Sequence, residues 1–188
     1  MYKLPVFYAT TDGHTRRIAE TIASVLREQG LQSEAIELSS RMPHPNWINI
    51  RSAVVGASVH AGHHQRAAAD FISREAQHLN VRPAAFFSVS LSAASSNPSK
   101  LDMIRSIATK FVRDAGWLTD RIACFAGKLA YTKYGFIKRF IMRRIAAAEG
   151  GPTDTSRDHE FTDWGAVREF ALKVADAAHG EAPVQAVS

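Results

Sequence analysis

The segment TTDGHT at residues 10–15 contains residue types that bind phosphate, and it lies between a strand-like run and a helix-like run. Backbone N–H groups at a helix start point outward at the positive end of the helix dipole, which suits an anion. Threonine hydroxyls can donate further hydrogen bonds, and a glycine lets the backbone approach a ligand closely. Because an Asp carboxylate would repel a phosphate, we expect the one here to bond its own turn. The candidate residues are Thr10, Asp12, Gly13, His14 and Thr15. The alternative is an ordinary Asp-Gly turn in which Thr15 caps the helix.

Other chemistries have weaker signals in this sequence. There is no GxxxxGK[ST] motif and no GxGxxG motif, which disfavours nucleoside-triphosphate cleavage and a classical NAD site. The single cysteine, Cys124, lies in an apolar run, so we expect it to pack in the core rather than act as a catalytic thiol. His60, His63 and His64 offer nitrogen ligands for a metal, but no Cys, Asp or Glu in their loop completes a set. We therefore predict no metal site, and no side chain stands out as a catalytic acid or base.

Strand-like and helix-like segments alternate along the chain, which is typical of a parallel sheet with helices on both faces. The expected strands are residues 3–9, 31–38, 53–58, 84–89 and 122–129. The expected helices are residues 15–29, 65–79, 101–115 and a last helix capped by Thr162 or Asp163. In such folds the ligand loops lie at the carboxyl ends of the strands. The expected ligand loops are residues 10–15, 58–64 and 88–98.

Composition and charge narrow the class of partner. The 188 residues carry a formal net charge of +5 and a pI near 9.6, which favours phosphate, carboxylates or lipid headgroups as partners. We expect no nucleic-acid partner, because helix-turn-helix, zinc and RNP signatures are missing from the sequence. No signal peptide is recognised, and no apolar run approaches the roughly 20 residues of a membrane span. Together with the single cysteine, these features indicate a reducing cytoplasm.

The segment before the last helix is far longer than an ordinary connection between elements. Residues 130–157 contain the run YTKYGFIKRFIMRRIAAAEGG, which has an apolar helical stripe with basic residues beside it. Such an insertion suits an anionic membrane surface or an acidic, hydrophobic substrate. The alternatives are a surface helix packed on the sheet edge, a protein partner, or self-association into an oligomer. The candidate substrate or membrane residues are Lys133, Lys138, Arg139 and Arg143.

Four segments, taken in order, carry a resemblance to a known family. FYATTDGHTRRIA looks like the phosphate loop of flavodoxins. GASVHAGHHQ, FFSVSL, and GGPTDT followed by FTDW resemble the menaquinone-dependent (oxygen-independent) protoporphyrinogen oxidases. The resemblance implies one flavodoxin-like α/β domain over residues 1–178, with residues 179–188 as a flexible tail. It also implies a doubly wound, five-stranded parallel sheet in the order 2-1-3-4-5, with the long insertion associated with the last strand.

The same resemblance implies the cofactor FMN and gives roles to the second and third loops. In the flavodoxin-like family the second loop flanks the isoalloxazine ring, and residues of the third contact its pyrimidine edge. The implied ring-binding residues are Ser58, Val59, His60, Ala61, Gly62, Ser88, Val89, Ser90 and Leu91. Two of these depart from the resembled oxidases, which carry a basic residue in place of His60 and a bulky aromatic in place of Ala61. A polar, mobile loop is the alternative for residues 88–98.

The implied function is the oxidation of protoporphyrinogen IX to protoporphyrin IX in haem synthesis, with FMN passing the electrons to menaquinone. The implied location is the inner face of the cell membrane, with the protein bound peripherally. The rivals are an electron-carrier flavodoxin and an NAD(P)H:quinone reductase of related fold. Because carrier flavodoxins are typically acidic and this chain is basic, the sequence favours the enzyme over the carrier.

Overall fold

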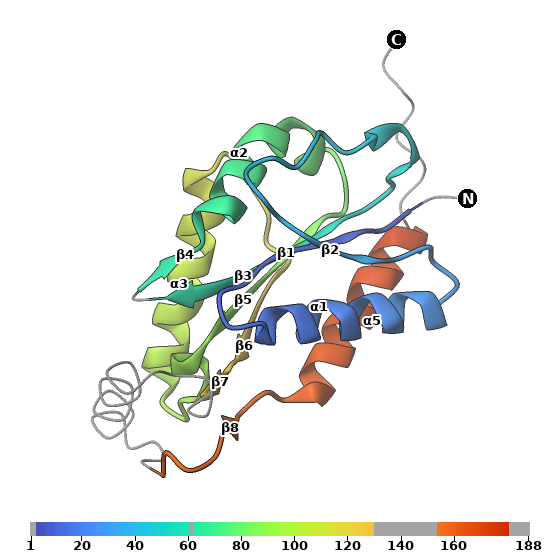
Figure 1. Cartoon of the computed structure of the whole chain (residues 1–188). Coiled ribbons are helices and arrows are strands. Elements are labelled where there is room, and N and C mark those ends of the chain that lie inside the picture. Colours follow the sequence, from blue (N-terminus) through green and yellow to red (C-terminus); the bar gives the residue numbers. More distant parts are fainter. Residues whose placement is uncertain (1–2, 61, 130–153, 181–188) are drawn as a thin grey trace.

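Parallel strands form the central sheet in the order β2-β1-β3-β5-β6, as the computed structural model in Figure 1 shows. The structure describes residues 3–60, 62–129 and 154–180. The strands of this path are β1 (Val6–Ala9), β2 (Ala35–Glu37), β3 (Val54–His60), β5 (Ala85–Ser90) and β6 (Ile122–Ala126). Since β5 and β6 are the fourth and fifth parallel strands, the order predicted from the resemblance is confirmed. Short strands buried on both faces explain why the sequence shows continuous apolar runs.

Helices cover both faces of the sheet (Figure 1). The helices of the two layers are α1 (His14–Glu28), α5 (Trp164–Gly180), α2 (Arg66–Leu79) and α3 (Pro98–Asp114). One core cluster joins α1 and α5 to the sheet through Ile22 and Val167, and the other joins α2 and α3 through Ile72 and Val112. No helix in the described ranges is long and apolar enough to span a bilayer.

One glycine allows a close approach between neighbouring strands of the sheet. A Cβ added to Gly56 in β3 would lie 2.0 Å from the Cζ atom of Phe87 in β5. Phe87 is fully buried and makes tilted or edge contacts with Phe125 and Phe170, so its ring has no room to withdraw. A residue without a side chain is therefore needed at this point of the sheet.

The structure departs from the expected elements in two places. The second loop is a hairpin: β3 continues to His60 and pairs antiparallel with β4 (His63–His64). The last expected strand is two strands, because β6 ends at Ala126 and Gly127 separates it from β7 (Lys128–Leu129). β7 pairs antiparallel with β8 (His159–Glu160), which lies just before α5. An apolar run alone does not reveal such a break, since the strand changes partner without changing composition.

Two 3₁₀ helices, η1 (Trp47–Asn49) and η2 (Leu91–Ala94), complete the described elements. η1 is fixed to α2 by a buried carboxylate: Trp47 Nε1 donates to Glu75 Oε2 at 2.8 Å, and Arg74 Nε and His44 Nδ1 each lie 2.8 Å from Glu75 Oε1. Burial raises the pKa of Glu75, but hydrogen bonds from Arg74 and Trp47 outweigh it and leave the pKa below its ordinary value. The carboxylate is therefore charged and well partnered.

Candidate functional site

Three expected ligand loops meet at one edge of the sheet. The strands β1, β3 and β5 are neighbours and parallel, with Ala9 opposite Ala57 and Ser58 opposite Val89. Their carboxyl ends therefore point the same way, and the segments that follow them lie side by side. These segments are the 10–15 turn, the β3–β4 hairpin and η2. The structure thus brings together the three loops that the sequence singled out.

The 10–15 turn would offer an anion mainly backbone N–H groups. Gly13 has φ +84° and opens α1, a conformation that favours glycine, and a Cβ added there would meet nothing within 4 Å. Its N–H donates to Thr10 Oγ1 at 3.0 Å, which closes the turn. The first turn of α1 has no acidic residue and no side-chain cap. Asp12 lies half-buried in the turn, while Thr15 is only 1% exposed. Phosphate chemistry at this turn would therefore rest mainly on N–H groups and Thr10.

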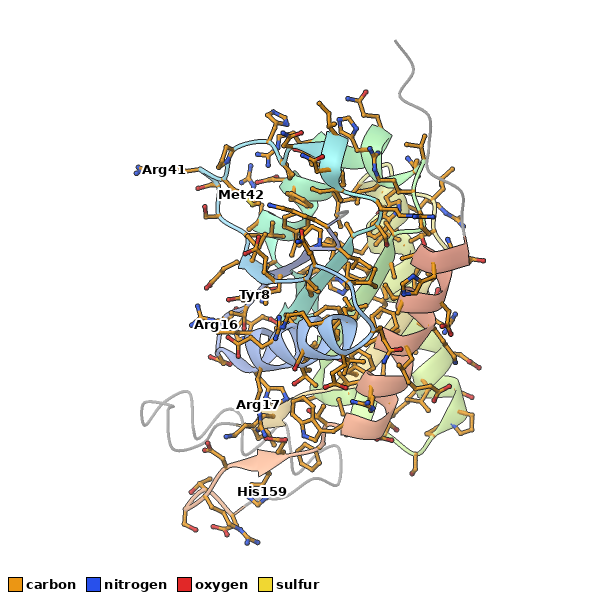
Figure 2. All side chains as sticks on the ribbon, turned by 90° about the vertical axis from the view of Figure 1, so that its right-hand side faces the viewer. Tyr8, Arg16, Arg17, Arg41, Met42 and His159 are labelled. Carbon is orange, nitrogen blue, oxygen red and sulfur yellow. The ribbon has the colours of Figure 1, made fainter. Side chains whose placement is uncertain are left out.

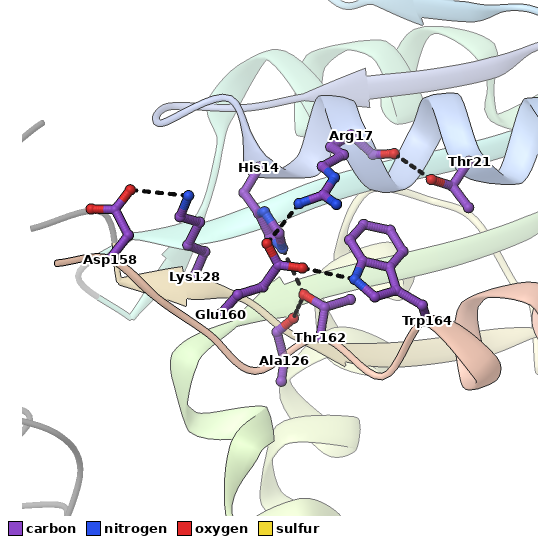
Figure 3. A network of polar contacts seen from close by, with 9 residues as sticks. All are labelled: His14, Arg17, Thr21, Ala126, Lys128, Asp158, Glu160, Thr162 and Trp164. Atoms are coloured by element: carbon purple, nitrogen blue, oxygen red, sulfur yellow. Dashed lines mark hydrogen bonds and ion pairs between the residues drawn. The ribbon is translucent and has the colours of Figure 1, made fainter. Parts of the chain in front are cut away.

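His14 points toward the segment that precedes α5, where it meets Thr162 (Figure 3). Its Nε2 lies 2.6 Å from Thr162 Oγ1, and that hydroxyl donates to Ala126 O at 2.8 Å. Because the Thr162 proton is committed to the carbonyl, Nε2 carries the proton of the first bond. Burial lowers the pKa of His14, so a neutral ring fits this place. Asp163, rather than Thr162, caps α5, since its Oδ1 accepts from Ala166 N at 3.0 Å.

A second set of contacts joins α1 to the strand that precedes α5 (Figure 3). Arg17 Nη1 pairs with Glu160 Oε2 at 2.7 Å, and Trp164 Nε1 donates to Glu160 Oε1 at 2.7 Å. The Arg17 guanidinium also lies over the Trp164 ring, 4.7 Å from its centroid. Nearby, Lys128 Nζ pairs with Asp158 at 3.0 Å across the β7–β8 pair. These contacts hold β8 against the start of α1, the helix that follows the 10–15 turn.

Arg16, the neighbour of Arg17 in α1, is paired with residues of β1 and β2. Arg16 donates through Nε to Tyr8 Oη at 2.7 Å and pairs through Nη2 with Glu37 of β2. Figure 2 shows Tyr8, Arg16 and Arg17 along one side of the molecule, with His159 of β8 at its lower end. Two cations in the first turn are unfavourable at the positive end of a helix dipole. Their carboxylate partners from β2 and β8 offset that cost.

The expected ring-binding residues occupy different positions around the hairpin. Ser58 and Val59 are half-buried at the end of β3, and His60 is exposed. Gly62 turns the hairpin with φ +82°, and Ala61 lies outside the described residues.

The third loop offers mainly backbone. Ser88 and Val89 are buried, and Val89 packs in the core beside α1 and α5. Ser90 Oγ accepts from Ala93 N at 3.3 Å and so caps η2, while Leu91 is half-buried. Because their side chains are buried, Ser88 and Val89 could contact a ligand only through their backbone atoms.

Sequence reasoning missed the side chains that join these loops. Gln65 Nε2 donates to Thr11 Oγ1 at 3.0 Å and to Ser58 Oγ, and His64 Nε2 lies 2.9 Å from Ser88 Oγ. In the sequence, His60 is an implied ring-binding residue, and His60, His63 and His64 offer metal ligands; no link to Ser88 is predicted for His64. No group of His, Cys, Asp and Glu able to hold a metal ion is found in the described part of the chain. The candidate substrate or membrane residues of the insertion, Lys133, Lys138, Arg139 and Arg143, lie outside the described residues.

Comparison with known proteins agrees with this arrangement. The family model described as a flavodoxin domain matches residues 5–156, so the chain belongs to the flavodoxin-domain family. A solved structure, oxidised flavodoxin 1 from Bacillus cereus, has a TM-score of 0.54 at 16% identity and covers 93% of this chain and 97% of its own. At that identity the likeness establishes the fold.

Within this family the chain groups with particular enzymes. It is 37% identical over 92% of its length to the protoporphyrinogen IX dehydrogenase [quinone] of Escherichia coli K12, of which 94% is covered. It is 32% identical over 90% of its length to the protein of the same name from Leishmania major, of which 73% is covered. The family resemblance found in the sequence is confirmed.

Proposed function

We propose that this chain is an FMN enzyme that oxidises protoporphyrinogen IX to protoporphyrin IX in haem synthesis and passes the electrons to menaquinone. The observation that carries the proposal is the meeting of an uncapped, glycine-opened helix start with two further loops at one sheet edge. This arrangement occurs in a chain whose relatives carry the name protoporphyrinogen IX dehydrogenase [quinone]. The site supports a phosphate-bearing ligand, and the relatives support the substrate.

An orphaned polar atom supports the fit of FMN to this site. Gln65 Oε1 is buried and has no hydrogen-bond partner among the described residues. The amide lies between Thr11 of the turn and Ser58 of β3, where a chain linking a phosphate to a ring would run. A ribityl chain carries hydroxyl donors that match an unsatisfied carbonyl oxygen. When bound, the flavin would supply hydride acceptance from the porphyrinogen and electron transfer to the quinone.

The protein's own residues would bind and orient the cofactor and the substrate. Gly13 and the start of α1 would hold the phosphate, and the hairpin and η2 would position the ring. We assign the substrate propionates, or an anionic membrane surface on the inner face of the cell membrane, to basic residues of the insertion. These are Lys133, Lys138, Arg139 and Arg143. A chain with net charge +5 is suited to either anion.

An anaerobic assay tests the proposed activity. The protein is loaded with FMN, mixed with protoporphyrinogen IX and a menaquinone analogue, and followed by porphyrin fluorescence. We expect porphyrin formation that requires both the protein and the quinone. Flavin retention without porphyrin formation would instead identify an electron carrier. Reduction of the flavin by NADPH with quinone turnover would identify a reductase of the same fold.

A pair of glycine variants tests the phosphate site separately. Gly13 and Gly30 lie at opposite ends of α1, with φ +84° and +79°, and an added Cβ meets nothing within 4 Å at either place. Gly13→Ala and Gly30→Ala therefore carry similar backbone strain, on the order of 1 kcal/mol each. We expect Gly13→Ala to weaken FMN binding by about tenfold and Gly30→Ala to leave it unchanged. Equal FMN affinity in both variants would rule out the turn as the phosphate site.

A further inference from the structure

His64 of the return strand β4 and Gln65, which directly follows it, carry side chains that reach all three ligand loops. His64 reaches β5, where its Nε2 lies 2.9 Å from Ser88 Oγ. Gln65 reaches the other way, to Thr11 Oγ1 of the turn at 3.0 Å and to Ser58 Oγ of β3. Consecutive residues thus cross-link the turn, the hairpin and the strand that leads into η2. We call His64 and Gln65 the hairpin clasp.

The surroundings of His64 make its half of the clasp rigid and uncharged. Its ring stacks on Phe111 of α3, with centroids 4.2 Å apart and an interplanar angle of 24°. Phe86 meets the ring edge-on at 5.7 Å. Burial lowers the pKa of His64 to about 4. The neutral imidazole therefore keeps its hydrogen bond to a serine that is itself 1% exposed.

The hairpin depends on these anchors because its own pairing is short. β4 is matched to β3 only by Val59 with His64 and His60 with His63. Such a short antiparallel pair has little stability of its own in water. The β3–β5 pairing ends at Ser58, so residues 59–60 hold their position relative to β5 through His64, and the end of β3 is tied to the turn through Gln65.

We propose that the hairpin clasp preorganises the flavin site, with a separate effect at each end of the cofactor. Gln65 sets the position of the 10–15 turn relative to β3, so it is a positioning residue for the phosphate of the proposed FMN. His64 sets the position of the hairpin relative to β5, so it is a positioning residue for the ring. The inference rests on the proposed function, in that the ligand is a flavin.

The test compares two isosteric variants with two neighbouring controls. Gln65→Leu keeps the side-chain size and removes both hydrogen bonds, while His64→Phe keeps the stack on Phe111 and removes the bond to Ser88. The controls are Arg66→Leu and His63→Phe, whose side chains are exposed. Each apoprotein is titrated with FMN and with riboflavin, which lacks the phosphate, and the midpoint potential of the bound flavin is measured.

We expect Gln65→Leu to raise the Kd for FMN by about three- to tenfold, because one or two hydrogen bonds that fix the turn are lost. Riboflavin also carries the ribityl chain and so loses the proposed contact with Gln65 Oε1, but it has no phosphate to be affected by the turn. Its affinity should therefore fall less than that of FMN, and the midpoint potential should change little. His64→Phe should weaken FMN and riboflavin equally and shift the midpoint potential. Both controls should match the wild type.

Wild-type affinities and potentials in both clasp variants would overturn the inference while leaving the proposed function intact. Absence of flavin binding in the wild-type protein would instead refute the proposed function, and the inference with it. Ser88→Ala and Thr11→Val remove the same bonds from the opposite side with smaller changes in volume. They decide the result should His64→Phe or Gln65→Leu fail to fold.

Discussion

Acidification should destabilise this fold through His64. Burial lowers the pKa of His64 to about 4, whereas in the unfolded chain the ring has its ordinary value of 6.5. Between these two values the unfolded state binds more protons than the folded state, so stability rises with pH. The stability that depends on the neutral ring is therefore complete above pH 6.5 and is lost as the pH falls toward 4.

The magnitude follows from proton linkage. The gap between the two pKa values is worth roughly 1.36 kcal/mol for each pH unit, or about 3 kcal/mol over the whole range. At about pH 5 the unfolded ring is almost fully protonated and the folded ring is mostly neutral, which gives a loss of about 2 kcal/mol. That loss is a large share of the stability of an ordinary domain.

Urea unfolding of the wild type and of His64→Phe measures this loss. At about pH 7.5 the variant should be less stable by about 1–2 kcal/mol, because the buried Ser88 hydroxyl loses its partner. At about pH 5 the two proteins should be nearly equal, since the variant has no ring to protonate at this site. Burial also lowers the pKa of His14, but that group is common to both proteins and cancels in the difference. Burial raises the pKa of Cys124, which lies opposite Ser88, so its thiol is protonated throughout.

Parallel loss of stability in the two proteins would refute the assignment of the titration to His64. The control is His63→Phe, which removes a histidine from an exposed position one residue away. It should keep the wild-type pH dependence, so that the change in slope belongs to the buried ring alone.

Three further substitutions test the packing and the charge pairs. Glu75→Gln should lower the free energy of unfolding by about 1.5–3 kcal/mol, because the buried side chain loses its charge-assisted contacts with Arg74 and His44. Chemical denaturation would show the loss, and a value below about 0.5 kcal/mol would contradict a charged, fully partnered Glu75. Gly56→Ala should cost about 1–3 kcal/mol through the clash with Phe87, measured by thermal unfolding, and an unchanged Tm would refute the close approach. A double-mutant cycle of Arg17→Gln and Glu160→Gln, measured by urea unfolding, should give a coupling energy of about 0.5–1 kcal/mol for this partly exposed pair. A coupling energy of zero would show that the pair does not help to hold β8 against α1.

The sequence predicted the parallel sheet and its helices because their signals are local. Buried strands such as β5 read as continuous apolar runs, and α1 carries Ile18, Ile22 and Leu26 at helical spacing. The hairpin could not be predicted in this way. His63 and His64 carry no strand-like alternation, and β4 exists because of what it pairs with and packs on. Tertiary contact decides such short elements.

In the candidate site, too, the local features were predictable and the long-range contacts were not. The 10–15 turn was predictable because its glycine and its helix start lie within a few residues of each other. The contacts that orient it were not, since His14 bonds a residue 148 positions away and Gln65 bonds one 54 positions away. Thr162 illustrates the difference: its place before a helix predicted a cap, but Asp163 caps α5 and Thr162 joins Ala126 to His14.

The charges at the start of α1 bear directly on the proposed phosphate site. Arg16 and Arg17 lie in the first helical turn, where the dipole disfavours cations, so a bound dianion would relieve their electrostatic cost. Glu37 and Glu160 provide part of that relief from β2 and β8 without entering the turn itself. Because both pairs are partly exposed, each contributes only modestly and can rearrange around a ligand. The two carboxylates thus offset the arginine charges from outside the helix start, and the first turn of α1 itself holds no acidic residue that would repel the proposed phosphate.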